Sequence, residues 1–442
     1  MKASQFNISY RYEDYYILFN TKTREIVRFP LKQQGLVDML LRNEGEQYRD
    51  DIKIMLSKKG FMVPAQIDEL EELRSQCYNL VNSKILYLTI MPTYTCNLSC
   101  IYCFQHHIQG AIIDDSTVEK IIKAVEKNID GHEALYVEWF GGEPLVASKQ
   151  VLHMNQRFNE ICHTAKIPYA ARITTNGYNL SLDIFCELQK NNCFVYYISV
   201  DGDQKLHDRQ RPCKNGAGSY EVIMNNLKKI KWNVASNNFR IEIRVNCSRE
   251  SYDCLETFLA DFERDLGNDR RFSLVIETVN DWSDRTEKMN EEGKLLEQSD
   301  LGELAKIARR YNINLASTDR HLLNTQICQA AKRNAYSIFY DGTIRKCQMA
   351  QESKEYCQMD VIGEITNNGD FMIDEAKEAF WVSDVFPQSC TSCKLLPLCL
   401  GKKCVFSIKI KNEICQDIED KFLNYFISYD ASKIENIELC KL

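Results

Sequence analysis

Short apolar runs recur along the middle of this chain, and most of them are followed by stretches with apolar positions three or four residues apart. Such runs predict strands, and such spacing predicts helices that pack by one face. We expect six strands, at residues 85–92, 134–140, 169–175, 194–201, 239–246 and 271–278. Strands that alternate with helices form a parallel sheet. The pattern therefore predicts an α/β fold, with a partial (β/α)6 barrel of the TIM type over residues 85–313.

The segments on either side of this region have different patterns. Residues 1–84 begin with two β-rich runs around a turn, and helical stretches follow at about 31–41, 48–59 and 64–82. This order predicts a small α+β domain of winged-helix type. Residues 314–442 are poor in regular pattern and rich in cysteine, so we expect a third domain there.

Composition narrows the class of protein. The 442 residues are 44% hydrophobic and 26% charged, as in a soluble globular protein. A net charge of −7 disfavours a general nucleic-acid or anionic-membrane binder. We find neither a signal peptide nor an apolar stretch of about 18 residues, and expect a cytoplasmic protein. In that reducing compartment the 19 cysteines indicate metal binding or catalysis rather than disulfides.

Three cysteines follow the first predicted strand directly. Cys96, Cys100 and Cys103 form a Cx3Cx2C run. Three thiolates are one fewer than a closed zinc or 4Fe–4S site requires, so one iron of a cluster could bind a cofactor. The alternative is a zinc knuckle with a distant fourth cysteine. His106 and His107 follow in a stretch that we interpret as a solvated loop.

Polar and glycine-rich motifs stand at the ends of the next strands, where barrel enzymes place functional residues. Glycines let the backbone approach a ligand closely, and a carboxylate such as Glu143 can accept hydrogen bonds from a cationic amine. In chain order the motifs are Gly141-Gly142-Glu143-Pro144, Thr174-Thr175-Asn176-Gly177, Ser199-Val200-Asp201-Gly202, His207-Asp208-Arg209-Gln210-Arg211, Gly216-Ala217-Gly218-Ser219-Tyr220, and Arg244 with Asn246.

The cysteine run, with aromatic Tyr102 before its third cysteine, resembles the hallmark of the radical S-adenosylmethionine superfamily, and the later motifs match its order. The resemblance implies that Cys96, Cys100 and Cys103 hold a catalytic 4Fe–4S cluster. S-adenosylmethionine would chelate the open iron and be cleaved to a 5′-deoxyadenosyl radical, with electrons from a donor such as flavodoxin or ferredoxin. The implied cofactor-binding residues are Tyr102, Gly141, Gly142, Glu143, Asn176, Ser199, Arg211, Arg244 and Asn246.

By this resemblance the three parts of S-adenosylmethionine have separate contacts. Glu143 and its glycines correspond to the segment that holds the amino group. Ser199 and Arg211 correspond to contacts with the carboxylate, which a guanidinium fork suits. Arg244 and Asn246 correspond to residues that approach the ribose.

The cysteine-rich tail resembles the SPASM domain, which adds two auxiliary 4Fe–4S clusters and would bring the total to three. The chain departs from that pattern by one extra residue between Cys399 and Cys404. A double zinc ribbon is the alternative, since zinc takes the same thiolate tetrahedra. The resemblance assigns Cys390, Cys393, Cys399 and Cys415 to the distal cluster, and Cys328, Cys347 and Cys404 to the proximal one, with Cys357 or no protein group as fourth ligand.

Enzymes that resemble this chain mostly modify peptides or proteins. Residues 1–84 resemble the element with which peptide maturases grip a leader, usually by β-augmentation. We therefore predict a maturase that installs a thioether or carbon–carbon crosslink in a ribosomally made precursor peptide. A sulfatase-maturase-like enzyme that oxidises Cys or Ser to formylglycine is the alternative. An extension that only packs on the barrel, small-molecule or RNA chemistry, and a scaffold without activity also stay open.

Overall fold

The computed structural model describes residues 1–44, 50–105, 110–279, 284–311, 314–315, 325, 327–352, 358–402, 404–409 and 434–437. Contacts divide the chain into two compact units. Unit 1 comprises Met1–Asn82, Ser317–Cys328 and Ser383–Leu442, and unit 2 comprises Ser83–Ala316 and Gln329–Val382. Two unit boundaries fall near the expected domain boundaries at 84 and 313, whereas the segment after 314 is divided between the units.

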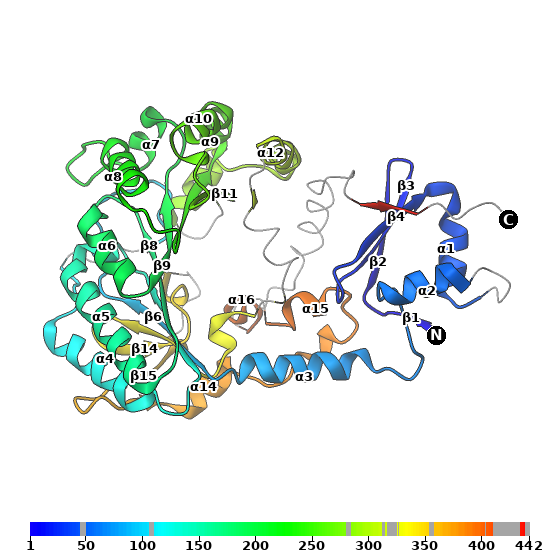
Figure 1. Cartoon of the computed structure of the whole chain (residues 1–442), viewed down its shortest axis with the longest axis horizontal. Coiled ribbons are helices and arrows are strands. Elements are labelled where there is room, and N and C mark those ends of the chain that lie inside the picture. Colours follow the sequence, from blue (N-terminus) through cyan, green and yellow to red (C-terminus); the bar gives the residue numbers. More distant parts are fainter. Residues whose placement is uncertain are drawn as a thin grey trace. The chain divides into compact units, whose positions relative to one another are not determined.

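The six predicted strands of unit 2 are present and form one parallel sheet in chain order (Figure 1). Their outward edges are occupied by other strands, so the six do not close on each other among the described residues. The prediction of a large parallel sheet is confirmed. The strands are β6 (Ile85–Met91), β7 (Ala134–Trp139), β8 (Tyr169–Thr175), β9 (Cys193–Ser199), β10 (Arg240–Cys247) and β11 (Phe272–Thr278).

Helices connect these strands, and α4, α5, α6 and α8 lie along one face of the sheet (Figure 1). Side chains accept hydrogen bonds from free amides where several of them begin. Asp114 accepts from the Thr117 amide before α4, and Ser181 accepts from the Ile184 amide before α6. The helices are α4 (Asp115–Asn128), α5 (Ser148–Ala165), α6 (Leu182–Lys190), α7 (Gln204–Gln210), α8 (Tyr220–Asn233), α9 (Arg249–Asp253), α10 (Leu255–Phe262), α11 (Asp284–Glu291) and α12 (Gln298–Arg310).

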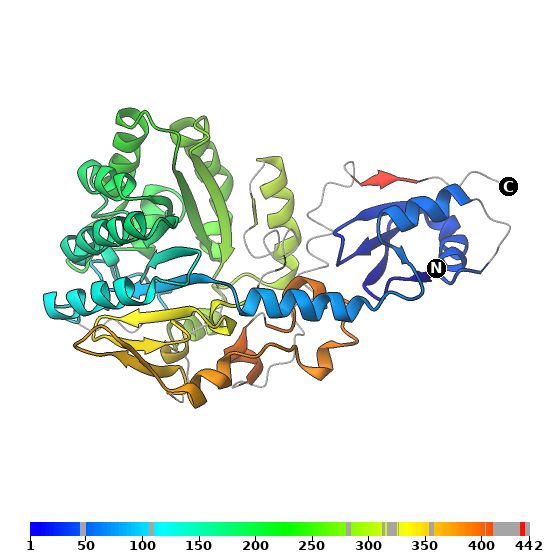
Figure 2. The ribbon, with the colours of Figure 1, turned by 60° about the horizontal axis from the view of Figure 1, so that its bottom comes forward.

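Part of the tail adds strands to the same sheet, which the expectation of little regular structure there did not foresee. β13 (Ala335–Phe339) pairs in parallel with β6, and three antiparallel strands continue the sheet beyond it (Figure 2). Each has only three to five residues, too few to show an alternating pattern. They are β14 (Thr343–Arg345), β15 (Val361–Ile365) and β16 (Phe371–Ile373), followed by α14 (Glu375–Trp381), while β12 (Asn314–Leu315) pairs with β11.

Unit 1 is built on a mixed sheet in the order β17-β4-β3-β2, in which β4, β3 and β2 pair antiparallel and β17 pairs in parallel with β4. One face of the sheet packs against α1 and α2. On the other face, Ile17 and Phe19 pack against Leu395 and Leu398 from the tail. Its elements are β2 (Asn7–Tyr12), β3 (Tyr15–Asn20), β4 (Ile26–Pro30), β17 (Glu435–Asn436), the pair β1 (Lys2–Ala3) and β5 (Met62–Val63), and the helices α1 (Gln34–Leu41), α2 (Asp50–Lys58), α3 (Glu69–Val81), α15 (Leu396–Cys399) and α16 (Val405–Lys409).

The predicted helices of residues 1–84 therefore correspond to α1, α2 and α3. Within the described ranges, no helix is long and apolar enough to cross a bilayer.

Candidate active site

A cavity of about 360 Å³ opens in unit 2 where the parallel strands end. Carboxyl ends of parallel strands meet at one edge of a sheet, and this is where such folds place functional residues. All twelve barrel residues predicted as ligands or cofactor contacts line this single cavity. They are Cys96, Cys100, Tyr102, Cys103, Gly141, Gly142, Glu143, Asn176, Ser199, Arg211, Arg244 and Asn246.

The loop that bears the three cysteines is fixed along the end of α7 and the residues that follow it. The Ser99 amide donates to the Pro212 carbonyl at 2.8 Å, and the Ile101 amide donates to the Gln210 carbonyl at 3.0 Å. Since Cys100 lies between the two donors and Arg211 between the two acceptors, this pairing places the Cys100 loop directly beside Arg211.

Burial strongly affects the cysteine thiols. It raises the pKa of Cys96 to about 12, with a smaller contribution from Glu143, and that of Cys100 to about 11. A thiol binds metal as the thiolate, so these side chains need a nearby cation to ionise at neutral pH. Bound iron supplies such a charge. Among the described residues, no three His, Cys, Asp or Glu side chains are grouped so as to hold a single metal ion.

Two glycines at the end of β7 let the cysteine loop approach the sheet. Gly141 has a φ of 120°, and a Cβ there would stand 2.5 Å from the Thr93 carbonyl oxygen. A Cβ on Gly142 would stand 2.6 Å from the Thr95 carbonyl oxygen. Real Cβ atoms do not approach backbone so closely, so any side chain at these positions would push the loop away.

Glu143 is buried and ties the end of β7 to the end of β8. Its Oε1 accepts hydrogen bonds from the Leu145 amide at 3.0 Å and the Thr175 hydroxyl at 2.7 Å. Its Oε2 accepts from the Asn176 amide at 2.7 Å. The carboxylate thus fixes two adjacent strand ends, and each oxygen accepts at least one bond from the chain itself.

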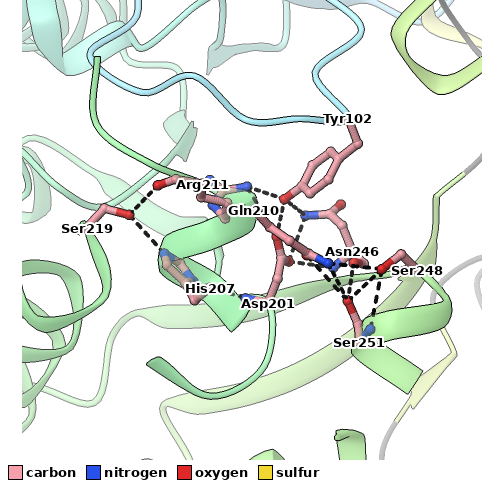
Figure 3. Close-up of polar contacts among 9 residues, drawn as sticks. All are labelled: Tyr102, Asp201, His207, Gln210, Arg211, Ser219, Asn246, Ser248 and Ser251. Atoms are coloured by element: carbon pink, nitrogen blue, oxygen red, sulfur yellow. Dashed lines mark hydrogen bonds and ion pairs between the residues drawn. The ribbon is translucent and has the colours of Figure 1, made fainter. Parts of the chain in front are cut away.

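A buried hydrogen-bonded cluster joins the cysteine loop to the ends of β9, α7 and β10 (Figure 3). Its members are Tyr102, Asp201, Arg211 and Asn246. Arg211 Nη1 donates to the Tyr102 hydroxyl at 2.5 Å and lies 3.6 Å from Asp201 Oδ2. Tyr102 in turn bonds Asp201, and the Asn246 amide donates to Asp201 Oδ1 at 2.7 Å. Burial lowers the pKa of Arg211, but Cys100, Tyr102 and Asp201 outweigh it and raise the pKa well above its ordinary value. The guanidinium therefore stays charged at the cavity wall.

Hydrogen-bond donors without a partner indicate what kind of ligand the cavity could bind. The Nε atoms of Arg211 and Arg244 and the side-chain amide nitrogen of Gln105 belong to residues that line the cavity, are buried and have no hydrogen-bond partner among the described residues. Buried donors are normally paired. Two cationic donors, three thiols and a glycine-lined wall fit an iron–sulfur cluster together with a ligand that bears a carboxylate and hydroxyl groups.

His207 lies in α7, four residues before Arg211, and is fully buried. Burial and the charge of Arg211 lower its pKa well below the ordinary value of 6.5. In the unfolded chain the imidazole takes up a proton below about pH 6.5 and in the folded chain it does not. Its contribution to stability is therefore present above that pH and is lost as the pH falls below it.

We accordingly expect the apparent melting temperature of the wild-type protein to fall more steeply than that of His207→Gln between about pH 6.5 and about pH 5. Thermal melts of both proteins across this range measure the difference. Parallel curves would show that His207 does not titrate differently in the folded and unfolded states.

Some residues that line the cavity were not predicted from the sequence. Phe140, Gln105 and Glu277 also line the cavity, as do Thr278 and Val279. Glu277 and Thr278 are the last two residues of β11, the sixth predicted strand, so the rule that located the other strand-end motifs could have found them. Phe140 ends the second predicted strand and directly follows β7, so the same rule could have found it. Gln105 shows no such signal, because an amide residue is ordinary in a loop.

The predicted auxiliary ligands are distributed over both units. Cys347 follows β14 in unit 2, whereas the other described ones belong to unit 1. In unit 1 the Cys328 amide donates to the Lys402 carbonyl at 2.8 Å, beside the extra residue noted before Cys404. Cys357, Cys415, His106 and His107 lie outside the described residues. The unit 1 set is Cys328, Cys390, Cys393, Cys399 and Cys404.

Comparisons with known proteins agree with this geometry. Residues 90–236 match the sequence profile of the Radical SAM superfamily. A serine-type anaerobic sulfatase-maturating enzyme of Bacteroides thetaiotaomicron is 29% identical over 181 residues, which cover 36% of this chain and 42% of that protein. The mycofactocin maturase of Mycolicibacterium smegmatis is 26% identical over 175 residues, covering 39% and 40% of the two chains. The chain thus spans less than half the length of these curated relatives.

A solved structure gives the same fold over a longer range. Native anSMEcpe with bound AdoMet and a Kp18Cys peptide superposes with a TM-score of 0.58 at 17% identity, covering 77% of this chain and 97% of that one. At this identity the likeness shows the fold alone. Together with the matched profile and the cavity that unites the predicted motifs, it leads to one conclusion: the chain contains a radical SAM domain.

Proposed function

We propose that this enzyme is a peptide maturase that uses S-adenosylmethionine to install a thioether or carbon–carbon crosslink in a ribosomally made precursor peptide. Cys96, Cys100 and Cys103 hold the 4Fe–4S cluster in the cavity. When bound, the cluster would supply the electron for reductive cleavage of S-adenosylmethionine, the chemistry that yields methionine and a 5′-deoxyadenosyl radical able to take a hydrogen atom from a peptide.

The cavity side chains have separate binding roles in this proposal. The charged Arg211 and the neighbouring Ser199 bind the carboxylate of S-adenosylmethionine. Asn176 and the Gly141–Glu143 segment face its amino group. Arg244 and Asn246, at the end of β10, face the ribose. The unpaired Nε atoms of the two arginines support the binding of an oxygen-rich ligand at this wall.

The observation that supports a peptide substrate is the four-stranded sheet of unit 1. Its β4 edge is paired with β17, and β2 has no further strand beside it among the described residues. An edge strand presents unpaired amides and carbonyls, to which an extended peptide can add as another strand. We assign leader binding to the β2 edge.

The tail completes the proposal with two auxiliary 4Fe–4S clusters. Of the two alternatives for the fourth ligand of the proximal cluster, Cys357 or no protein group, we propose Cys357. A fully ligated cluster would suit electron transfer out of a substrate radical, whereas an open iron could bind a substrate thiolate. The proposed ligands are Cys328, Cys347, Cys357 and Cys404 for the proximal cluster, and Cys390, Cys393, Cys399 and Cys415 for the distal one.

A sulfatase-maturase-like activity is the second candidate, because the sequence matches include serine-type and cysteine-type anaerobic sulfatase-maturating enzymes. Mass spectrometry separates the two. The gene neighbourhood is searched for a short precursor, and that peptide is incubated anaerobically with the reconstituted enzyme, S-adenosylmethionine and reductant. We expect loss of two hydrogen atoms, no fragmentation between two linked residues, and no reaction with hydrazide. A hydrazide-reactive aldehyde on a single residue would instead establish formylglycine formation.

The leader-binding role of β2 predicts a specific effect of Ser9→Pro. Tyr12 and Tyr15 flank the two-residue turn and pair across the strands, so the amide of Ser9, three positions earlier, points to the open edge. Proline removes that donor without breaking the β2–β3 ladder. We expect on the order of a tenfold weaker leader binding, measured by anisotropy of a labelled leader peptide.

Ser9→Ala is the matched control, because it removes the same hydroxyl but keeps the amide. If Ser9→Pro and Ser9→Ala bind the leader equally well, the β2 edge is not the binding site. Deleting residues 1–84 would be less informative, since it would also uncover the Leu395 and Leu398 side chains in the core of unit 1.

A further inference from the structure

We infer that His207 and Ser219 form a hydrogen-bonded relay that positions Arg211 and Asp201 for binding of S-adenosylmethionine. The inference rests on the proposed role of Arg211. Both relay residues are fully buried, neither lines the cavity, and they join the backbone of the two residues of the Arg211–Asp201 ion pair. Their part is therefore to position rather than to react.

The relay runs from one backbone group to the other through two side chains (Figure 3). The Asp201 amide contacts His207 Nδ1 at 3.2 Å, and His207 Nε2 lies 3.1 Å from Ser219 Oγ. The Ser219 hydroxyl contacts the Arg211 carbonyl oxygen at 2.7 Å. One imidazole thereby fixes the backbone of the carboxylate residue directly and that of the guanidinium residue through a single hydroxyl.

Only one arrangement of protons satisfies all three contacts. A backbone amide can only donate, so His207 Nδ1 must be the acceptor. A backbone carbonyl can only accept, so the Ser219 hydroxyl must donate to Arg211 and accept from His207 Nε2–H. The relay therefore requires the neutral imidazole protonated on Nε2.

The start of α8 is built so that Ser219 is free for this task. A serine in the N-cap position normally accepts a hydrogen bond from an amide of the first turn, yet Ser219 makes no such bond. Asp208 Oδ1 accepts from the Ser219 and Tyr220 amides instead, both at 2.8 Å. A Cβ on Gly218 would overlap the Asp208 carboxylate, so glycine permits this close approach.

Arg211 is the first residue after α7, where the backbone leaves the helix. The hydrogen bond to its carbonyl oxygen therefore helps to fix the backbone at this position. The φ of −130° and ψ of 54° at Arg211 are not helical, and its amide donates to the His207 carbonyl at 2.7 Å. The bond from Ser219 holds the peptide that follows. The direction of the Arg211 side chain toward Tyr102 and Asp201 therefore depends on the relay.

The test measures equilibrium binding of S-adenosylmethionine to full-length, anaerobically reconstituted enzyme, together with KM and kcat for its cleavage. We expect Ser219→Ala to raise Kd and KM on the order of tenfold, as loss of a supporting contact typically does, with kcat at saturation near wild type. Tyr169→Phe is the matched control, since it removes one buried hydroxyl bond of 2.7 Å to Asn155, away from the cavity. It should lower the melting temperature comparably and leave Kd unchanged.

Two His207 variants keep the test informative if Ser219→Ala fails to fold. A glutamine amide reaches the position of Nε2 and can donate to Ser219, whereas asparagine reaches only the position of Nδ1. The relay predicts that His207→Gln binds S-adenosylmethionine more tightly than His207→Asn. Equal binding by these two variants would overturn the relay.

The variant Arg211→Gln distinguishes failure of the relay from failure of the proposed role of Arg211, on which the relay rests. If Arg211→Gln weakens binding but Ser219→Ala does not, the relay is wrong and the role of Arg211 stands. If Arg211→Gln also binds normally, the assignment of Arg211 to S-adenosylmethionine is wrong and the inference fails with it.

Discussion

Replacing Cys100 with alanine is expected to abolish formation of 5′-deoxyadenosine. Cys96, Cys100 and Cys103 are the cysteines that line the cavity. A cluster held by three thiolates does not survive the loss of one. With two auxiliary clusters in the tail, about two-thirds of the iron should remain bound. Product is measured by liquid chromatography with mass spectrometry, and iron by colorimetric assay on the same reconstituted sample.

Cys162→Ala is the control for this experiment, because its thiol is also buried but does not line the cavity. It should retain both product formation and the full iron content. Turnover by Cys100→Ala would exclude the triad as the site of reductive cleavage. Loss of all the iron would exclude independent clusters in the tail.

Gly142→Ala should lower the rate of S-adenosylmethionine cleavage by about a hundredfold, the effect of displacing reactive groups by roughly 1 Å. The added Cβ would stand 2.6 Å from the Thr95 carbonyl oxygen and 2.7 Å from that of Tyr94. Both belong to the backbone just before Cys96, and the Glu143 amide donates to the Thr95 carbonyl at 3.0 Å. The loop must therefore shift, and a cluster held by its cysteines would shift with it.

Gly35→Ala serves as the matched control. A Cβ on Gly35 would meet nothing within 4 Å, so the same chemical change should leave the cleavage rate unaltered. Initial rates of 5′-deoxyadenosine formation are compared at equal iron content. A Gly142→Ala enzyme as fast as Gly35→Ala would mean that the close approach of β7 to the cysteine loop is not needed for catalysis.

The sequence was informative about the parallel sheet because each of its six main strands is long enough to show its apolar run and is followed by helical sequence. The residues at the strand ends could be located for the same reason, since a parallel sheet brings those ends to one edge. Glu277 is the second-last residue of the last of these strands and was missed because no motif marked it.

Other features could not be read from local pattern because they depend on contacts between distant segments. β13 has five residues and owes its place to pairing with β6, about 250 positions earlier in the chain. The packing of Ile17 and Phe19 against Leu395 and Leu398 likewise joins the two ends of the chain. The division of the tail between two units follows from such contacts and leaves no periodic signal.

The relay behind Arg211 illustrates a third limit. His207, Asp208, Gly218 and Ser219 all stand in motifs that the sequence displays, but their partners are mostly backbone groups. A motif shows which side chains occur together. It does not show that Ser219 bonds the Arg211 carbonyl instead of capping its own helix.

The most direct test of the central claim is the product of S-adenosylmethionine with the wild-type enzyme under anaerobic, reducing conditions. Reaction at the cavity bounded by Cys96, Cys100, Cys103 and Arg211 predicts 5′-deoxyadenosine and methionine in equal amounts, formed only with reductant. Intact S-adenosylmethionine, or S-adenosylhomocysteine as the product, would contradict this account.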